Sequence, residues 1–324
     1  MAIDAAEPNT TIVVAGGVHA EQLTISKDGL TLIGRDTQLV PPPVADPNLC
    51  SGLAGPAPGQ VGVPTETGIC VVGHDVTFLP FTDHFPVDQV GRPVRSVRIT
   101  GFDITGFTGP HIAVLGGQGV RVDDNDLARP TSFGVLSDGS RHSRITGNRI
   151  TGFAPPDVGY IGVCVHDVAA PVVDDNDIAG QLIGICVGTT GAQVADNRVH
   201  GNCVGMYVDP GVGATITRNH IFDNNECDLS GAEFGRGITM AGAIGTVVRH
   251  NLIEGHHAAD GAPAVRITDD VGGWHAGTGT VATRNVVTNN TIADNTLDLV
   301  STATGRNRIA HNVCTSSVPA NLCG

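Results

Sequence analysis

One short sequence phrase recurs eight times from residue 122 onward. It consists of an aliphatic residue, two variable residues, an asparagine, one variable residue and usually a second aliphatic residue. Self-similarity at intervals of roughly 20 to 30 residues indicates stacked supersecondary units, each of which buries its apolar edge only against its neighbours. The chain is therefore expected to fold as a solenoid. The asparagines of the eight phrases are Asn125, Asn148, Asn176, Asn197, Asn219, Asn251, Asn290 and Asn312.

The composition of the repeats decides between a helical and a β solenoid. They are rich in Val, Ile, Thr, Gly and Asn and alternate with period two, as in Ile161–His166 and Ile183–Gly188, which is typical of strands. With 44 Gly, 19 Pro and turn-forming Asp-Asn dipeptides between short strands, no segment has the long amphipathic pattern of a helix-turn-helix array. Each repeat therefore fits one coil of a parallel β-helix, which is an all-β fold.

Three coil sequences and the opening of the chain resemble a known superfamily. The coils are Asp175–Ile178, Asp196–Val199 and Arg218–Ile221, and the opening runs from Thr11–His19 into Leu23–Lys27. They resemble the right-handed parallel β-helix superfamily, the pectin-lyase-like proteins. The resemblance covers nearly the whole chain and implies a single-stranded right-handed solenoid of about ten coils between residues 10 and 315. It implies architecture rather than reaction, because a fold does not fix a function.

The length of the chain is compatible with one domain. A compact globule of 324 residues would tend to split, but a solenoid grows in one dimension. We predict a single domain over residues 1–324, with a cap and first coils at 1–40, an irregular insertion at 41–95, regular coils at 96–315 and a tail at 316–324. Each repeated asparagine is expected to point inward at a turn and to stack on its equivalent in the next coil, where it satisfies backbone groups rather than binding sugar or metal.

Charge and hydropathy restrict the partners. The net charge of -14 and the single lysine, Lys27, argue against nucleic acid or an anionic membrane. No hydrophobic run approaches the length of a membrane span. We expect a secreted protein whose export signal is absent from this chain, because residues 1–6 lack the basic and apolar regions of a signal peptide.

The eight cysteines form an even set, which fits an oxidising compartment. We predict disulfides Cys50–Cys70 and Cys314–Cys323, and Cys203–Cys227 is a further plausible pair about one coil apart. A bridge between Cys164 and Cys186, on equivalent positions of adjacent strands, is left open, since stacked strands bring Cα atoms to ~4.8 Å. No Cys-x-x-Cys spacing indicates a structural zinc site.

The strand about 13 residues before each asparagine carries the candidate catalytic residues. Period-two alternation predicts that its second and fourth residues face outward, and the chemistry gathers at Asp138, His166, Tyr207, Asp209 and Arg266. Asp138 and His166 fall on adjacent coils, ~4.8 Å apart at Cα, so the carboxylate is expected to orient the imidazole. His166 or Tyr207 would act as base and acid, while Arg266 would neutralise a carboxylate.

Long loops beside this strand are predicted to form two banks of a groove and to bind substrate. Their candidate residues are Tyr160, Phe234, His256, His257, Trp274 and His275. No metal is expected, because these histidines lack a carboxylate at fixed spacing. Calcium is the one cofactor left open, although the acidic clusters at the turns are better explained as coil corners, because they lack the ligand series of a dedicated site.

These features favour a secreted carbohydrate-active enzyme that holds a polysaccharide in a groove on an exposed parallel sheet, and a lyase is favoured over a hydrolase or an epimerase. Hydrolysis through Asp138 and Asp209 is disfavoured, because three coils separate them by ~14 Å, more than the ~6.5 to 9.5 Å of an inverting pair. Two alternatives stay open: a non-catalytic carbohydrate-binding or surface solenoid, and an isomerase or cyclase acting on a small molecule. The oligomeric state is also left open.

Overall fold

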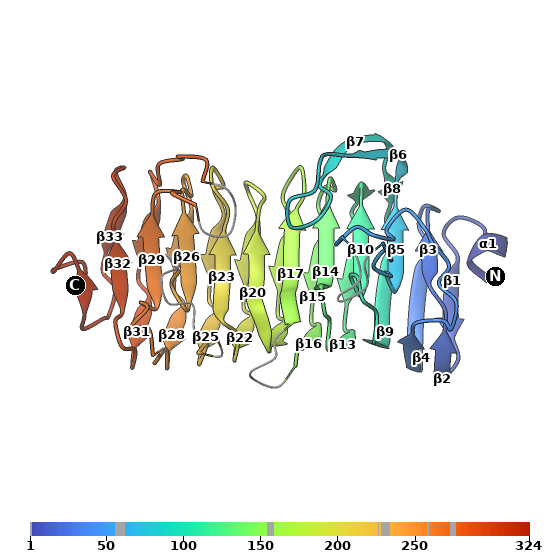
Figure 1. Cartoon of the computed structure of the whole chain (residues 1–324), viewed down its shortest axis with the longest axis horizontal. Helices are drawn as coiled ribbons and strands as arrows, with labels where there is room; N and C mark the ends of the chain where they lie inside the picture. Colours follow the sequence, from blue (N-terminus) through green and yellow to red (C-terminus); the bar gives the residue numbers. More distant parts are fainter. Residues whose placement is uncertain are drawn as a thin grey trace. The chain divides into compact units, whose positions relative to one another are not determined.

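The computed structural model describes all residues except 1, 56–61, 154–158, 226, 228–233, 258 and 273–276. The regular secondary structure of the described part consists almost entirely of short strands, and α1 (Ala2–Ala5) is a four-residue helix (Figure 1). The chain divides into two compact units: unit 1 comprises residues 1–152 and 159–172, and unit 2 comprises 153–158 and 173–324. Each unit is described by itself. Within the described residues, no helix has the length and apolar character needed to cross a membrane.

Unit 1 contains two parallel sheets, which we name the front and back sheets. The strands of its front sheet pair in chain order, and they are β3 (Leu23–Ile25), β5 (Ile69–Val72), β10 (Ile112–Leu115), β14 (Phe133–Asp138) and β17 (Gly159–His166). The strands of its back sheet are β1 (Thr11–Val14), β2 (Gly17–Ala20), β4 (Thr31–Val40), β9 (Arg98–Thr105), β12 (Arg121–Asp123), β13 (Asp126–Ala128), β15 (Arg144–Thr146) and β16 (Arg149–Thr151).

Unit 2 repeats the same arrangement. Its front strands are β20 (Gln181–Val187), β23 (Val204–Val208), β26 (Ile238–Ala241), β29 (Val265–Thr268), β32 (Leu299–Ser301) and β34 (Ser317–Val318). Its back strands are β18 (Val172–Asp174), which begins at the last residue of unit 1, β19 (Asp177–Ala179), β21 (Gln193–Ala195), β22 (Arg198–His200), β24 (Thr215–Thr217), β25 (His220–Phe222), β27 (Val247–Arg249), β28 (Leu252–Glu254), β30 (Val286–Thr288), β31 (Thr291–Ala293) and β33 (Arg308–Ala310).

The aliphatic residue that precedes each repeated asparagine forms the core. In unit 1 Val122 is the register partner of Ile145, and in unit 2 Val194 is followed by Ile216 and Val248 in successive coils. All five side chains are at most 1% exposed, and burial of such a side chain stabilises the fold by roughly 1.5–3 kcal/mol. The solenoid therefore has one continuous apolar interior within each unit.

The repeated asparagines form the predicted ladder. In unit 1 the side-chain amide of Asn125 donates to Oδ1 of Asn148 over 3.0 Å. In unit 2 Asn176 donates to Asn197 over 2.9 Å, and the same bond runs on through Asn219, Asn251, Asn290 and Asn312. The prediction that these side chains are structural, and that Asn176 and Asn197 share a corner, is confirmed.

A left-handed residue makes the corner that the asparagine follows. The residue before the asparagine has a φ of +57° at Asp124, +56° at Asp175, +55° at Asp196 and +57° at Arg218. This conformation is costly for most residues and is tolerated best by Asp, Asn and Gly. The Asp-Asn dipeptides of the sequence are therefore the signature of this turn.

A second ladder in unit 2 was not foreseen. The backbone N–H of Asn202 donates to Oδ1 of Asn224 over 3.0 Å, and the N–H of Asn224 donates to Nδ1 of His256 over 3.2 Å. His256 in turn donates its N–H to Oδ1 of Asn295 over 3.0 Å. A histidine thus occupies one rung of an asparagine ladder.

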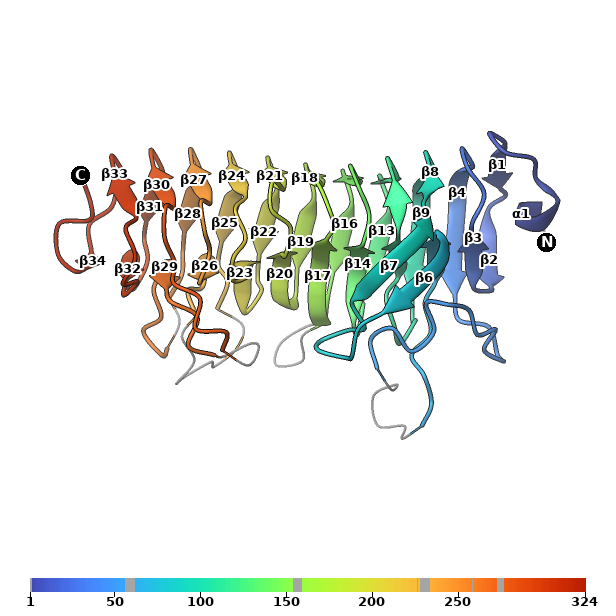
Figure 2. The same cartoon turned by 90° about the horizontal axis from the view of Figure 1, so that it is seen from above.

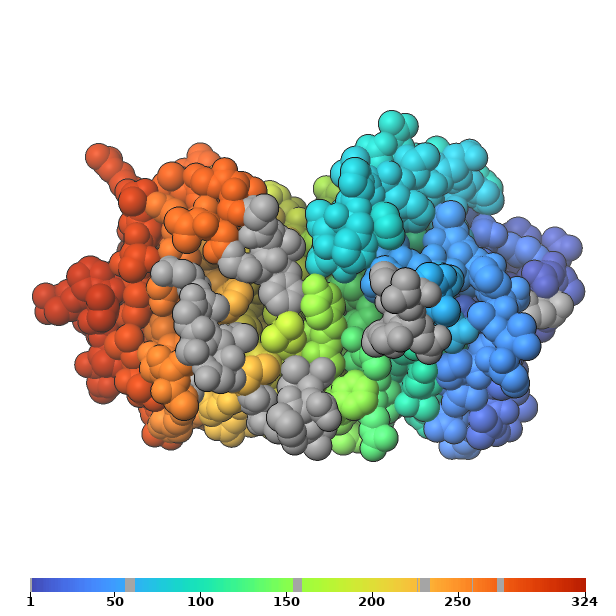
Figure 3. Space-filling view, in the orientation of Figure 1, coloured from blue at the N-terminus to red at the C-terminus, as the bar shows by residue number. Residues whose placement is uncertain are grey.

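The segment at 41–95, which was expected to be irregular, contains β5 and an antiparallel hairpin of β6 (His74–Phe78) and β7 (Val87–Arg92). In Figures 1 and 2 the hairpin lies outside the stacked strands of unit 1, next to β14, and in the space-filling view it projects as a raised cyan bank (Figure 3). Gly139 permits this contact, because a Cβ at that residue (φ +62°) would lie 2.5 Å from Cγ1 of Val87. After the hairpin, β8 (Val94–Arg95) pairs with β11 (Gly117–Gln118).

The disulfides agree with the sequence prediction. Cys50 pairs with Cys70, Cys203 with Cys227 and Cys314 with Cys323, at Cα separations of 5.9, 5.0 and 5.2 Å. Cys164 and Cys186 are also in the disulfide form, and no described cysteine is a free thiol. Cys50–Cys70 ties the start of the insertion to β5, which holds the base of the hairpin segment against unit 1.

Candidate functional site

The hairpin of unit 1 brings a histidine onto the front sheet. His84 lies in the connection between β6 and β7, and its side chain has no solvent exposure. Its Nε2 lies 3.1 Å from Oδ2 of Asp138 on β14 and 3.4 Å from Nδ1 of His166 on β17. The backbone N–H of Val87 also donates to Oδ2 of Asp138 over 2.8 Å. Residues more than 50 positions apart in sequence thus form one cluster.

The other ring nitrogen of His84 is held by the neighbouring carboxylate. Its Nδ1 lies 2.8 Å from Oδ1 of Asp83. Burial by itself would lower the pKa of His84, but the hydrogen bonds to Asp138 and Asp83 and their charges raise this pKa to about 9. Burial by itself would raise the pKa of Asp83, but the hydrogen bond and charge of His84 outweigh it and hold that pKa below its usual range. In the absence of other cations, the imidazole is therefore an imidazolium between two carboxylates.

The predicted neighbourhood of Asp138 and His166 is confirmed, because the two residues are register partners on β14 and β17. Their exposure differs from the prediction. Asp138 is only 3% exposed, and every residue of β10 and β14 is buried. The prediction of an exposed sheet was wrong here, since the insertion covers the face that period-two alternation turns outward. Oδ2 of Asp138 contacts the His84 ring and accepts a hydrogen bond from the backbone N–H of Val87.

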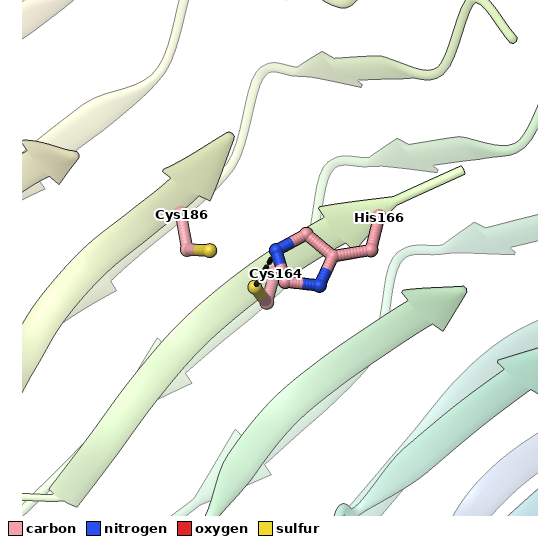
Figure 4. A group of neighbouring side chains, drawn as sticks. All are labelled: Cys164, His166 and Cys186. Atoms are coloured by element: carbon pink, nitrogen blue, oxygen red, sulfur yellow. Dashed lines mark hydrogen bonds between the residues drawn. The ribbon is translucent and has the colours of Figure 1, made fainter. Parts of the chain in front are cut away.

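His166 is half-buried, and its ring extends toward Cys164 on the same strand (Figure 4). Its Nε2 lies 3.8 Å from the sulfur of Cys164, two residues earlier on the same strand. The opposite ring nitrogen, Nδ1, faces His84. The ring is thus oriented by contacts at both nitrogens. Because Cys164 is in the disulfide form, its sulfur is a packing neighbour rather than a thiolate.

A small cavity adjoins this cluster in unit 1. It has a volume of 240 Å³, below the roughly 300–1,000 Å³ of pockets for drug-sized ligands. Two aromatic residues, Phe81 and Tyr160, and one carboxylate, Asp83, contribute to the lining. Most of the remaining lining residues carry hydroxyl groups, and these are Thr65, Thr82, Thr108, Thr131 and Ser132.

Two buried polar atoms of this cavity lining have no hydrogen-bond partner within the described part of the protein. One is Oγ of Ser132 and the other is Oδ2 of Asp83. The second oxygen of Asp83, Oδ1, accepts hydrogen bonds from Thr82 Oγ1, from the His84 backbone and from the His84 ring. A buried polar atom without a partner costs about 1–3 kcal/mol. Both atoms belong to residues that line the cavity.

Tyr160, predicted to bind substrate, lines this cavity. Its ring packs edge-on against Phe133 at 5.6 Å between centroids. Burial and the nearby charge of Asp83 raise the pKa of Tyr160 well above its ordinary value, so the phenol keeps its proton. Tyr160 therefore combines a protonated phenol with a flat apolar ring surface.

The candidates in unit 2 do not form the predicted exposed face. Tyr207 is only 2% exposed and packs edge-on against Phe234 at 6.0 Å. The prediction that Tyr207 faces solvent was therefore wrong, and burial followed by the charges of Asp209 and Asp270 raises its pKa far above the usual value. Asp209 and Arg266 are half-buried, and Arg266 is the register partner of Thr239.

The loop histidines have separate places. His256 is fully buried as a rung of the second ladder, so its assignment to an accessible substrate-binding loop was wrong. Burial is the main cause that lowers its pKa to about 3. His257 is exposed, and its Nε2 lies 3.5 Å from Oδ1 of Asp294. Trp274 and His275 lie outside the described residues.

Sequence reasoning missed Asp83 and His84. Both lie in the insertion between two regular coils, where no repeat fixes the register of a residue against the sheet. The signal available in the sequence was indirect: Thr82-Asp-His84 follows a segment bracketed by the predicted Cys50–Cys70 disulfide. A stapled insertion that carries a histidine next to a carboxylate is a reasonable place to search for site residues.

The stacked parallel sheets and the asparagine ladders define a parallel β-helix protein. Residues 110–292 match the family described as the right handed beta helix region. The chain belongs to this family, and the solenoid is right-handed. No curated protein matches the sequence.

Solved structures agree with this fold. Alginate lyase from Paenibacillus sp. str. FPU-7 is similar with a TM-score of 0.60 and 16% identity, over 96% of this chain and 94% of the lyase. The A-module of the mannuronan C-5 epimerase AlgE4 from Azotobacter vinelandii has a TM-score of 0.56 and 14% identity, over 97% and 94%. The Dettilon tailspike protein has a TM-score of 0.55 and 16% identity, over 93% of this chain but only 59% of the tailspike. At these identities the likeness shows the fold alone.

Proposed function

We propose that the protein acts on carbohydrate and that the cavity beside Tyr160 in unit 1 binds one sugar unit. The observation that carries this proposal is the chemistry of the lining, which combines five hydroxyl-bearing residues and a tyrosine with two unpartnered buried polar atoms. A sugar presents hydroxyl groups around its edge and apolar C–H faces above and below its ring. Tyr160 and Phe81 suit the faces, and Ser132 and Asp83 suit the hydroxyls. The structural likeness to enzymes named for alginate and mannuronan is consistent with this class.

The charge of the cavity lining favours a neutral sugar over a uronate. The lining contains the Asp83 carboxylate and no Lys or Arg among the described residues. A uronate would place a second carboxylate near Asp83 without a guanidinium or ammonium to offset the repulsion. The lyase reaction favoured by the sequence relies instead on Arg266 of unit 2 to neutralise a uronate. The cavity of unit 1 is therefore suited to a neutral sugar, whereas Arg266 of unit 2 would suit a uronate.

A secreted location forms part of the proposal. All eight cysteines are in the disulfide form, and such bonds persist in oxidising compartments. Peptide mapping of the natively exported protein under non-reducing conditions checks this point, and recovery of Cys50 and Cys70 as free thiols would argue against it.

The test is a panel of neutral and uronate-containing oligosaccharides, with binding measured by calorimetry and products by chromatography with mass spectrometry. We expect the neutral sugars to bind and Tyr160→Ala to weaken that binding roughly 10-fold or more. Ser132→Ala should weaken it about 3- to 10-fold through one lost hydrogen bond. Phe222→Ala is the matched control, because this half-buried ring stacks on His200 and His220 in unit 2.

The products distinguish the reaction classes. Unsaturated ends indicate a lyase, new reducing ends without unsaturation indicate a hydrolase, and altered sugar composition without shortening indicates an epimerase. Binding without any product supports the non-catalytic alternative. If only uronates bind, and Tyr207→Phe removes turnover while Tyr160→Ala does not, the site lies in unit 2 and the cavity proposal fails.

A further inference from the structure

We propose that His84, Asp138 and His166 bind one divalent transition-metal ion. The three atoms that would ligate it are Nε2 of His84, Oδ2 of Asp138 and Nδ1 of His166, and all three lie within 4.8 Å of one another. The residues belong to the hairpin connection, β14 and β17, so the hairpin completes the set. This inference is independent of the sugar-binding proposal, because it concerns a different group of atoms.

The separations match those of ligands around one small ion. A tetrahedral zinc ion with bonds of about 2.0–2.1 Å holds its ligand atoms about 3.3 Å apart. Nε2 of His84 lies 3.1 Å from Oδ2 of Asp138 and 3.4 Å from Nδ1 of His166. Two imidazole nitrogens and a carboxylate oxygen, each able to offer a lone pair, therefore converge at ligand spacing.

The surroundings supply the outer contacts that metal ligands usually have. A ligating histidine donates its second ring nitrogen to a carboxylate or carbonyl, which fixes its tautomer. Nδ1 of His84 makes this contact with Oδ1 of Asp83 over 2.8 Å. The N–H of Val87 fixes the Asp138 oxygen over 2.8 Å, and Cys164 contacts the far side of the His166 ring. All three ligands are thus oriented before any ion arrives.

The donor set determines the class of ion. Two imidazoles with one carboxylate suit zinc, iron or cobalt, whereas calcium takes six to eight oxygen ligands. The cysteine next to His166 does not add a thiolate, because Cys164 is in the disulfide form. Three protein ligands leave at least one coordination position for water or another ligand, as in catalytic rather than structural zinc sites.

The experiment uses the full chain with its disulfides intact, stripped with a chelator and titrated with Zn²⁺ in a calorimeter. We expect one ion per chain for the wild type. His84→Ala and His166→Ala should each weaken binding by more than about 100-fold, while Asp83→Asn should weaken it about 10- to 100-fold, the usual effect of an outer partner. His200→Ala is the matched control, because this histidine also contacts a carboxylate, Asp177, at 2.9 Å but lies outside the cluster.

Substitution with Co²⁺ adds a readout that does not depend on activity. We expect visible d–d bands of a site with imidazole ligands and no sulfur-to-metal charge-transfer band. A charge-transfer band would show that sulfur, from Cys164, ligates the ion, and would overturn the proposed ligand set. Absence of a stoichiometric ion in the wild type, or binding unchanged in both His84→Ala and His166→Ala variants whose circular dichroism is native, would overturn the proposal and leave the cluster as an ion pair. Sugar binding measured in the same samples reports separately on the cavity.

Discussion

Units 1 and 2 are built from the same kind of coil but bury different charged side chains next to their front sheets. In unit 1 the insertion brings Asp83 and His84 onto Asp138, so an imidazole lies between carboxylates beside a hydroxyl-lined cavity. In unit 2 the buried charge is a guanidinium: Arg236 is fully buried, forms an ion pair with Asp260 and donates to the carbonyl of Cys203 over 3.1 Å.

The difference shows that the chemical groups gathered beside a front strand depend on the segment that covers it as well as on the strand itself. The front strands of both units alternate in the same way, and the outward-facing positions of Asp138 in unit 1 and Tyr207 in unit 2 are both buried. In unit 1 the cover supplies two of the candidate site residues. In unit 2 Arg236 joins the Asp260 side chain to the backbone carbonyl of Cys203 and therefore has a structural role.

The largest expected effect tests the contribution of the buried Arg236–Asp260 ion pair to the stability of unit 2. Arg236→Met would leave the Asp260 carboxylate, whose side chain is 7% exposed, without its counter-charge. Breaking one partner of a buried ion pair typically costs about 3–5 kcal/mol in the free energy of unfolding. Urea denaturation followed by circular dichroism measures it. Arg236→Met combined with Asp260→Asn should recover part of the loss, and an undiminished loss in the double variant would mean that Arg236 acts through the Cys203 carbonyl instead.

A smaller effect tests whether the asparagine ladders of the two units contribute equally to stability. Asn148→Ala in unit 1 and Asn251→Ala in unit 2 each remove the oxygen that accepts both the N–H and the Nδ2–H of the preceding rung. Both variants should lose about 3 kcal/mol, because the backbone N–H of the preceding rung is left without an acceptor and the bonds from the substituted amide to two backbone carbonyls are lost as well. Asn225→Ala, outside the ladders and with one side-chain bond to Gly255, should lose only about 1 kcal/mol. A clear difference between the first two would show that the ladders are not equivalent.

The smallest effect concerns the two buried neutral histidines, one in each unit. Burial lowers the pKa of His111 in unit 1 and of His256 in unit 2 to about 3. The unfolded chain takes up these protons as pH falls below about 6.5, whereas the folded chain does not until about pH 3. Stability is therefore lost between those values as the solution is acidified, by up to about 1.4 kcal/mol per pH unit for each histidine.

His256→Asn should remove one of these contributions and place an asparagine between Asn224 and Asn295. The slope of unfolding free energy against pH, measured by denaturant titrations from pH 6 to pH 4, should become shallower, while His200→Asn on the surface should change it little. An unaltered slope for His256→Asn would show that its ring is protonated in the folded protein.

The repeats made most of the fold predictable. An asparagine at a fixed place in each coil, with an aliphatic residue three positions earlier, reports both the left-handed corner and the core, so Asn176 and Asn197 could be placed without a structure. Three disulfides were predictable because the ends of coils bring Cys50 and Cys70, or Cys314 and Cys323, close together. These features depend on local spacing, which sequence expresses directly.

The covering segments were not predictable for the opposite reason. Alternation identified which side of β14 and β23 faces away from the core, but not what lies against it, so Asp138 and Tyr207 were expected to be exposed. His84 reaches Asp138 through a hairpin whose register against the sheet no repeat determines. His256 was read as a loop residue because its ladder partners, Asn224 and Asn295, do not belong to the phrase that revealed the first ladder.

The asparagine ladder also gives the solenoid a direction. Each rung donates two N–H bonds toward the following coil and accepts at its oxygen from the coil before, as between Asn219 and Asn251. Removing the following coil would leave the backbone N–H of a rung without an acceptor. Removing the preceding coil would leave its Oδ1 without donors and would break the bond from its Nδ2 to a carbonyl such as that of Val194, but Nδ2 keeps acceptors within its own coil and in the following one. Orphaned N–H groups are tolerated less well than under-used carbonyl oxygens. Loss of a following coil should therefore destabilise the remaining coils of a ladder more than loss of a preceding coil.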